Sequence, residues 1–280
     1  MPRSWVFAAM VGLVVFVGTV GPWSAVSASS TGKPISLSSV YWIFYKEDFN
    51  HLSAEAPDLM KQVAGGPGTY VLEQRKGGTR LPAKVIPVQY FFSSMGLETA
   101  IAQHKVISGV KVVADDLENF AVTPASERKN PIPALKGFGD AARAHGYRSI
   151  LMPGRDLMRV PGAVCSQRPG TTISQAYLRC GLPRAAAYAP IYVIQAAAVE
   201  TKLSALRQLV QDGAAQARKA NPHALVFATL SVSPNGLDVS ASAVAVAAEA
   251  IRPYVQGFFI NDLRPSDSRM LGFLRALSKP

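Results

Sequence analysis

The amino-acid sequence predicts an α/β fold: a (β/α)8 TIM-like barrel that is irregular in its first third. Short β-branched or aromatic runs alternate with helical patterns at spacings of roughly 30 to 40 residues, which is typical of βαβ units around a parallel sheet. Eight such runs fit a closed barrel of about 250 residues. The alternative is an open doubly wound parallel sheet, which is disfavoured because no glycine-rich phosphate-binding motif follows an early strand.

The first residues have the composition of a secretory signal peptide. A basic start at Arg3 precedes an apolar run from Trp5 to Val20, and Val26-Ser27-Ala28 supplies the small residues of a cleavage site. The alternative is a retained membrane anchor, but this run is short for the roughly 30 Å of hydrocarbon in a bilayer. We therefore expect a signal peptide at 1–28, a flexible leader at 29–38 and a single barrel domain at 39–280.

The charge of the chain restricts the class of partner. The formal net charge is +11, and Arg3 is the only charged residue of the expected signal peptide. A cationic exported protein is attracted to anionic cell-wall polymer, although a positive surface also simply favours solubility. The basic residues are scattered and form no tract interleaved with aromatic residues, so nucleic acid is not an expected partner. We expect a secreted monomer, free or associated with the cell wall, without stable membrane insertion after cleavage.

The first third of the barrel is where the expected order is least regular. A strand is predicted at 40–45, followed by a helix at 53–63 that is capped by Ser53 and ends at a glycine-rich segment. Strands at 69–72 and 85–92 come next. The segment between them is too short for a crossover helix, so we expect these two strands to pair as a hairpin.

From Phe92 onward, strands and helices alternate regularly. Thr123 is expected to cap a short helical turn, and Asn130-Pro131-Ile132-Pro133 is expected to separate this turn from the next helix. The remaining strands are predicted at 110–114, 147–152, 191–195, 224–230 and 255–260. The helices are predicted at about 94–104, 134–144, 176–178, 201–219, 240–251 and 270–277.

Two cysteines, Cys165 and Cys180, are the only ones in the chain. In an oxidising compartment such a pair forms a disulfide, and closing a loop of this size contributes roughly 3 kcal/mol in the chain-entropy model. The intervening SQRPGTTISQAYLR offers no convincing further ligands, so a metal site is the weaker interpretation.

An acidic triplet, Asp115, Asp116 and Glu118, directly follows the strand 110–114. Ligands of parallel barrels bind at the carboxyl ends of the strands. Asp116 and Glu118 are two residues apart, so an extended backbone directs both to the same side, whereas Asp115 faces the other way. Neighbouring carboxylates raise the proton affinity of a buried one, so Glu118 is the expected general acid and Asp116 its tuning partner. The alternative is a Ca²⁺ or Mg²⁺ site made by the three carboxylates.

Polar residues also follow most of the other predicted strands. Carboxylates, amides and arginine on one rim suit the hydroxyl groups of a sugar, although Asp or Ser after a strand often only caps the next helix. Phe120, beside the triplet, is the expected stacking residue. The expected substrate-binding residues are Asp115, Phe120, Arg155, Asp156, Gln195, Glu200, Ser231 and Asn261.

Asp116-Leu117-Glu118 resembles the Asp-x-Glu end of the acidic motif in chitinase-like, family 18-type glycoside hydrolases, which are secreted (β/α)8 barrels. The resemblance implies that Glu118 protonates the glycosidic oxygen and that Asp116 positions the acetamido group of the substrate. The chain departs from that pattern at Ala114, where the family has another Asp. A looser similarity, an Asp-x-Glu followed by Thr-Pro, links the chain to exported bacterial barrel proteins without an assigned activity.

Other chemistries find little support in the sequence. Of the four histidines, His104, His145 and His223 precede predicted strands, which places them at the opposite end of a barrel from the loops that carry chemistry. No motif of a serine or zinc hydrolase is present, and no cofactor is expected. Two hypotheses remain: a secreted carbohydrate-active hydrolase, or a non-catalytic barrel that binds a polysaccharide or cell-wall glycoconjugate.

Overall fold

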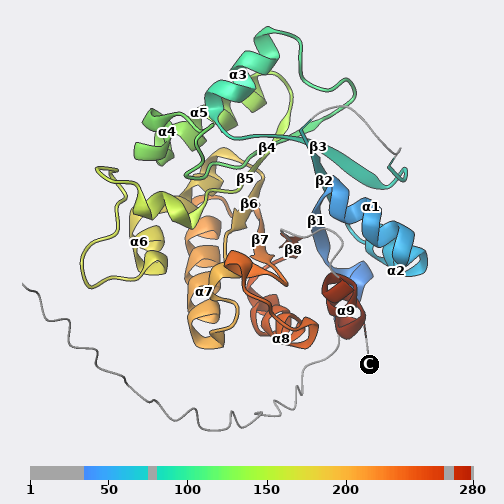
Figure 1. The fold of residues 1–280 in the computed structure, drawn as a ribbon. Coiled ribbons are helices and arrows are strands. Elements are labelled where there is room, and N and C mark those ends of the chain that lie inside the picture. The colour runs from blue at the N-terminus through green and yellow to red at the C-terminus, as the bar shows by residue number, and fades with distance from the viewer. Residues whose placement is uncertain (1–34, 75–80, 262–267, 279–280) are drawn as a thin grey trace, which may run out of the picture. The chain divides into compact units, whose positions relative to one another are not determined.

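Eight parallel strands form a closed barrel in the computed structural model, as the sequence predicts (Figure 1). The structure describes residues 35–74, 81–261 and 268–278, so the expected signal peptide and most of the expected leader lie outside the described residues. Each strand pairs with its neighbour in the chain, and β8 closes the barrel against β1. The strands are β1 (Tyr41–Tyr45), β2 (Thr69–Glu73), β3 (Val85–Phe91), β4 (Val112–Asp115), β5 (Arg148–Leu151), β6 (Ile191–Ile194), β7 (Leu225–Leu230) and β8 (Gly257–Ile260).

Helices surround the barrel and cover the outer faces of its strands (Figure 1). The α-helices are α1 (Lys46–Glu55), α2 (Pro57–Ala64), α3 (Ser94–Ala102), α4 (Ala125–Lys129), α5 (Pro131–Ala144), α6 (Ile173–Cys180), α7 (Leu203–Ala220), α8 (Ala241–Ile251) and α9 (Ser268–Leu277). Short 3₁₀ segments are η1 (Leu37–Ser39), η2 (Arg155–Arg159), η3 (Leu182–Tyr188), η4 (Ala197–Val199), η5 (Pro234–Gly236) and η6 (Arg252–Tyr254). No helix in the described ranges is both long and apolar enough to cross a bilayer.

Strands β2 and β3 are parallel, so the predicted hairpin is wrong. Thr69 pairs with Val85 and Leu72 with Val88 in parallel register. The connection from Gln74 to Lys84 needs no helix, because a chain of this length can return along a five-residue strand at roughly 3.3 Å per residue. Closure of the barrel decides the direction, since every strand must run the same way for β8 to meet β1.

The helix boundaries near prolines also differ from those predicted. The expected helix at 53–63 is two helices, α1 and α2, separated at Ala56 because the following Pro57 disfavours a helical conformation there. Ser53 lies inside α1 and caps nothing. Helix α5 begins at Pro131 rather than at residue 134, since proline fits the first helical position, where no backbone donor is needed. Thr123 does not cap α4.

The core has two layers that follow the alternation of side chains along each strand. Val112 and Ala114 of β4 pack inside the barrel, where they contact residues such as Ile43 and Phe259. Val113 points outward into the larger cluster between the strands and the helices. This period of two extends past the end of β4, so Asp116 continues the inward side and Asp115 the outward side.

The end of the expected leader packs on the barrel. Ile35 and Leu37 are buried, and Trp42 Nε1 donates a hydrogen bond of 2.9 Å to the carbonyl oxygen of Leu37. Residues 35–38 therefore belong to the folded part of the chain.

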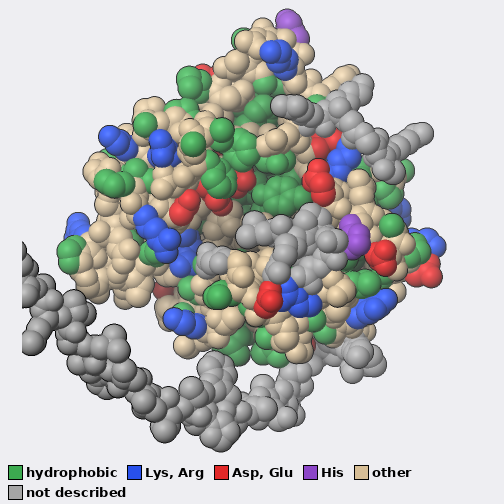
Figure 2. Space-filling model, in the orientation of Figure 1, with side chains coloured by type: hydrophobic (Ala, Val, Ile, Leu, Met, Phe, Trp, Pro, Cys, Tyr) green, Lys and Arg blue, Asp and Glu red, His purple; other side chains and the backbone are tan. Residues whose placement is uncertain are grey.

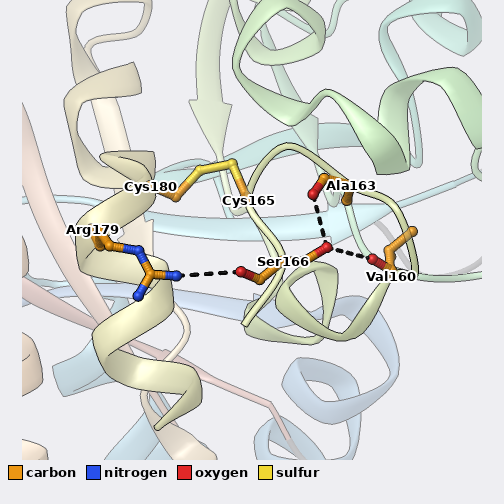
Figure 3. The surroundings of a disulfide bond; sticks show 6 residues. All are labelled: Val160, Ala163, Cys165, Ser166, Arg179 and Cys180. Atoms are coloured by element: carbon orange, nitrogen blue, oxygen red, sulfur yellow. Dashed lines mark hydrogen bonds between the residues drawn. A yellow bond between two sulfur atoms is a disulfide. The ribbon is translucent and has the colours of Figure 1, made fainter. Parts of the chain in front are cut away.

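A disulfide joins Cys165 to Cys180, which confirms the predicted pair (Figure 3). It links the loop that follows β5 to the last residue of α6. Ser166 fixes the same loop, because its hydroxyl donates to the carbonyl oxygens of Val160 and Ala163, and Arg179 donates to the Ser166 carbonyl (Figure 3). The loop after β5 is thus anchored to the C-terminal end of α6.

Candidate active site at the carboxyl ends of the strands

A cavity of about 270 Å³ lies at the carboxyl ends of the strands. Its walls come from the loops that follow β4 through β8, so Glu118 and Asn261 lie at the same cavity although they are far apart in the chain. Figure 2 shows a hollowed face of the molecule on which acidic and hydrophobic side chains lie side by side. The lining residues are Glu118, Arg155, Asp156, Gln195, Ala197, Ala198, Ser231, Ser233, Pro234 and Asn261.

The acidic triplet divides between two layers of the fold. Asp116, on the inward side, accepts a hydrogen bond of 3.4 Å from the Tyr45 hydroxyl. Asp115 is fully buried on the outward side, where burial and then the charges of Glu127 and Asp116 raise its pKa well above the usual range. Asp115 is therefore part of the framework between strand and helices, and it does not reach the cavity.

Glu118 is held in the protonated form by its surroundings. Burial raises its pKa to about 9, and the nearby charges of Asp116 and Asp156 add to the shift. Burial also raises the pKa of Asp116 to about 7, although the hydrogen bond from Tyr45 opposes this shift. A carboxyl group that stays protonated at neutral pH can donate a proton to a bound ligand, which is the property required of a general acid.

Asp156 lies next to Glu118, at the close approach that Gly154 permits. A Cβ atom on Gly154 would lie 2.4 Å from Asp156 Oδ1, 2.6 Å from Glu118 Cγ and 3.1 Å from Glu118 Cδ. Asp156 Oδ1 and Glu118 Cδ are therefore at most about 5.5 Å apart, an upper limit that includes the roughly 5 to 5.5 Å between the paired carboxyls of retaining glycosidases. Asp156 Oδ2 accepts a hydrogen bond of 2.9 Å from the backbone N–H of Asn119, which fixes its position.

The pairing of Glu118 with Asp156 was not anticipated from the sequence. Asp156 follows the fifth predicted strand, and it was expected only as one of several substrate-binding residues on the rim. The signal that could have identified it is the sequence Pro153-Gly154-Arg155-Asp156, which places a glycine shortly after a strand and two residues before a carboxylate.

The loops after β6 and β7 form a hydrogen-bonded wall. Gln195 Oε1 accepts from the Thr229 hydroxyl at 3.0 Å, and Ser231 Oγ accepts from the backbone N–H of Ser233 at 3.0 Å. Glu200 Oε2 accepts from the backbone N–H of Ser231 at 2.9 Å. Glu200 does not line the cavity; it lies behind the wall, where burial raises its pKa to about 8.

A row of aromatic side chains extends along the acidic side of the rim. Consecutive ring centroids are 5.3 to 5.6 Å apart, all in edge-to-face contact. Phe120 ends the row and is 37 % exposed. Phe92 is half-buried and belongs to this row. The row consists of Phe259, Tyr45, Tyr90, Phe92 and Phe120.

Tyr45 and Tyr90 were not predicted as site residues. Both continue the inward alternation of their strands, Tyr45 from Ile43 and Tyr90 from Val88. That alternation, followed to the last residue of each strand, is the signal that could have identified them.

The acidic triplet does not form a metal site. Asp115 faces away from Asp116, which removes one of the three ligands of the expected Ca²⁺ or Mg²⁺ site. Within the described ranges, no group of three or more His, Cys, Asp or Glu side chains is arranged to hold a metal ion.

Comparison with solved structures identifies the same fold in carbohydrate-active proteins. An alpha-L-fucosidase candidate from Bacteroides thetaiotaomicron matches 87 % of this chain and 95 % of its own, with a TM-score of 0.54 at 10 % identity. A GH128 (subgroup III) curdlan-specific exo-beta-1,3-glucanase from Blastomyces gilchristii matches 88 % of this chain and 100 % of its own, with a TM-score of 0.52 at 12 % identity.

No protein-family model and no curated protein sequence matches the chain. The resemblance of Asp116-Leu117-Glu118 to family 18-type enzymes therefore stays a prediction. At 10 to 12 % identity, the structural matches establish the architecture, a (β/α)8 barrel similar to those of glycoside hydrolases, and leave the chemistry to the site itself.

Proposed function

We propose that this chain is a carbohydrate-active hydrolase that cleaves glycosidic bonds, with Glu118 as the general acid. The observation that carries the proposal is a carboxyl group with a pKa of about 9 at a cavity, with a second carboxyl no more than about 5.5 Å away. A glycosidase needs both groups: one protonated to assist the leaving oxygen, and one ionised to act at the anomeric carbon.

The surroundings of Glu118, Asp156 and Asp116 support a different role for each of these side chains. Glu118 has a pKa raised to about 9 and makes no hydrogen bond within the described residues, so its proton is available to the glycosidic oxygen. Burial raises the pKa of Asp156, but the hydrogen bond from the backbone N–H of Asn119 opposes this shift and favours the ionised form, so we assign the ionised role to Asp156. Asp116 acts through Glu118, because its negative charge stabilises the protonated form of that side chain.

The aromatic row suits a sugar substrate. Sugar rings present apolar C–H faces that pack on aromatic side chains, while their hydroxyl groups require polar partners. Here Phe120, two residues after Glu118 in the chain, is exposed, and the polar side chains of Gln195, Ser231 and Asn261 line the cavity. We infer that the substrate is a polysaccharide or a cell-wall glycoconjugate and that the chain is exported, in keeping with the Cys165–Cys180 disulfide.

The proposal is tested by incubating the protein without residues 1–28 with a panel of glycans. Curdlan belongs in the panel because the structurally similar glucanase is specific for it. Chitin and cell-wall fragments test the resemblance to family 18-type enzymes. We expect release of reducing ends from at least one glycan, and a loss of about 10²- to 10⁴-fold in rate in Glu118→Gln.

The matched control for this test is Glu249→Gln on helix α8, which removes a carboxylate outside the cavity and should retain full activity. If no glycan is consumed, or if Glu118→Gln is as active as the wild type, the hydrolase proposal is wrong.

A second candidate function is a non-catalytic carbohydrate-binding barrel, and Ala114 favours it. The family 18-type pattern has an Asp at this position, whereas Ala114 is a buried small residue inside the barrel. This function predicts co-sedimentation with insoluble wall material without release of any product. The absence of retention on every wall fraction would exclude it.

A further inference from the structure

Arg155 is the one side chain at the cavity, among the described residues, that is always cationic. It begins η2, directly after Gly154, and its side chain lines the cavity. Its Nε and Nη1 atoms are buried and make no hydrogen bond. No carboxylate of the described residues forms an ion pair with it, and the ionisable groups that act on its pKa are Tyr177 and Arg159, which are not anions at neutral pH. Arg155 is therefore a partly buried cation without a counterion.

The wall formed by the loops after β6 and β7 adds hydrogen-bond donors to the cavity that Arg155 lines. Because Gln195 Oε1 already accepts from Thr229, the amide orientation is fixed and Nε2 is the group left buried without a partner. Ser231 Oγ accepts from the backbone N–H of Ser233, so its hydroxyl proton is free to be donated. This part of the cavity thus offers a guanidinium, an amide NH₂ and a hydroxyl proton, and all three require acceptors.

A buried cation and buried donors without partners are destabilising, because each has lost its hydration. A ligand that brings an anionic, acceptor-rich group would restore those interactions. A neutral hydroxyl could accept one hydrogen bond, but it would leave the charge of Arg155 uncompensated. A planar carboxylate matches the guanidinium fork with two parallel hydrogen bonds.

We propose that the cavity binds the carboxylate of a sugar acid, such as a uronic acid unit, through Arg155 and Gln195. This inference rests on the proposed carbohydrate function and names the class of its substrate. In this arrangement the carboxylated unit lies beside the bond that is cleaved, since Glu118 lines the same cavity.

The acidic residues of the cavity do not oppose an anionic ligand as strongly as their number suggests. Glu118 is uncharged at neutral pH. Burial raises the pKa of Asp156, whereas the backbone N–H of Asn119 and the charge of Arg159 oppose this shift and favour its ionised form. Glu200 lies behind the wall, and burial favours its neutral form. Arg155 therefore faces at most one charged carboxylate of the described residues at this cavity.

The test compares pairs of oligosaccharides that differ only in charge. Oligogalacturonates, oligoguluronates and hyaluronan hexasaccharides are each paired with a twin in which every carboxylate has been reduced to a primary alcohol. Binding is measured by titration calorimetry in the Glu118→Gln background, which prevents turnover. We expect at least one carboxylated member to bind at least about tenfold more tightly than its reduced twin.

Two variants of Arg155 locate that preference. Arg155→Met should abolish it, whereas Arg155→Lys, which keeps the charge but lacks the planar fork, should retain part of it. Arg143→Met on helix α5, which removes an exposed arginine outside the cavity, should leave it intact. Folding of each variant is checked by thermal unfolding; Arg155→Met should unfold at a temperature no lower than the wild type, since it removes a charge without a counterion.

Equal binding of the charged and reduced twins, binding of neither, or a preference that survives in Arg155→Met would overturn the inference. These outcomes are independent of turnover. A protein that prefers carboxylated twins but hydrolyses no glycan would refute the hydrolase proposal alone. A protein that hydrolyses a neutral glycan without any such preference would refute the carboxylate site alone.

Discussion

Two sides of the barrel rim carry similar polar residues but differ in how these residues are stabilised. On the side of β4 and β5, Asp116 and Glu118 have strongly raised pKa values, and Asp116 Oδ1 is buried without a partner. On the side of β6 and β7, Gln195 and Ser231 make hydrogen bonds of 3.0 Å to neighbouring residues. A polar residue after a strand is therefore not by itself a functional residue. On the first side burial keeps a carboxyl group protonated, whereas on the second side hydrogen bonds fix the side chains and leave Gln195 Nε2 as a donor without a partner.

The two sides also differ in what surrounds the polar groups. The aromatic row starts at Phe259 of β8, passes along β1 and β3, and ends at the exposed Phe120 after β4. The side of β6 and β7 carries the small residues Ala197, Ala198 and Ser231. We interpret the first side as the reactive half of the cavity and the second as the half that orients the ligand. Glu118→Gln is expected to have the largest effect on activity under this interpretation. Three further substitutions test the difference between the two halves.

Gly154→Ala tests whether the close pair of carboxyls is required. A methyl group at this position would lie 2.4 Å from Asp156 Oδ1 and 2.6 Å from Glu118 Cγ, so both side chains must move. A displacement of about 1 Å in an active site can reduce the rate about 10²-fold. We expect a loss of this size in kcat/KM on the glycan identified by the panel.

The control for Gly154→Ala is Gly272→Ala in helix α9, where the added methyl meets only Ala241 Cβ at 3.1 Å. It should leave kcat/KM within about twofold of the wild type, because surface changes of this kind alter stability only slightly. If Gly154→Ala is equally active, the proximity of Glu118 and Asp156 has no catalytic role.

Phe120→Ala tests the aromatic row. Removing an exposed ring that packs edge-to-face on Phe92 should weaken stacking with a sugar and raise KM about fivefold to tenfold, with little change in kcat. Val164→Ala, which removes another exposed hydrophobic side chain, serves as the control. A change in kcat without a change in KM would contradict a binding role for Phe120.

Glu200→Gln tests the half of the cavity at β6 and β7, which we interpret as the half that orients the ligand. It should have the smallest effect on activity, less than about threefold. Burial raises the pKa of Glu200 to about 8, whereas a glutamate in the unfolded chain titrates near 4.3. Between these values the folded state binds more protons, so stability is greatest below the unfolded pKa and is lost as the pH rises through the folded value.

We therefore expect the unfolding temperature of the wild type to fall between about pH 4.5 and pH 8, and Glu200→Gln to reduce this fall, because glutamine stays neutral and keeps an acceptor for the Ser231 N–H. Calorimetric scans across that pH range measure the effect. An identical pH dependence in both proteins would show that Glu200 is not buried in its neutral form.

The parts of the fold that were predicted correctly are those in which local pattern and tertiary role agree. The run Val110 to Ala114 is β-branched, and the structure has a buried strand at Val112–Asp115 with the acidic triplet at its end. The same reasoning failed for β2 and β3, since the direction of a strand depends on closure of the barrel rather than on the residues between the strands.

The candidate site was predicted only in part, for a related reason. Alternation along a single strand separates Asp115 from Asp116, so the sequence was sufficient for that assignment. The approach of Asp156 to Glu118 depends instead on how the loops after β4 and β5 meet across Gly154, and the orientation of the Gln195 amide depends on Thr229 from the next strand.

The sequence by itself determined the number and order of the strands and the end of the barrel at which polar residues gather, because side-chain periodicity and spacing along the chain encode both. Only the tertiary structure decided which of those residues become reactive. Burial, the nearness of other charges and the presence or absence of a hydrogen-bond partner arise between segments that are distant in the chain, and these three factors distinguish Glu118 and Arg155 from their neighbours on the same rim.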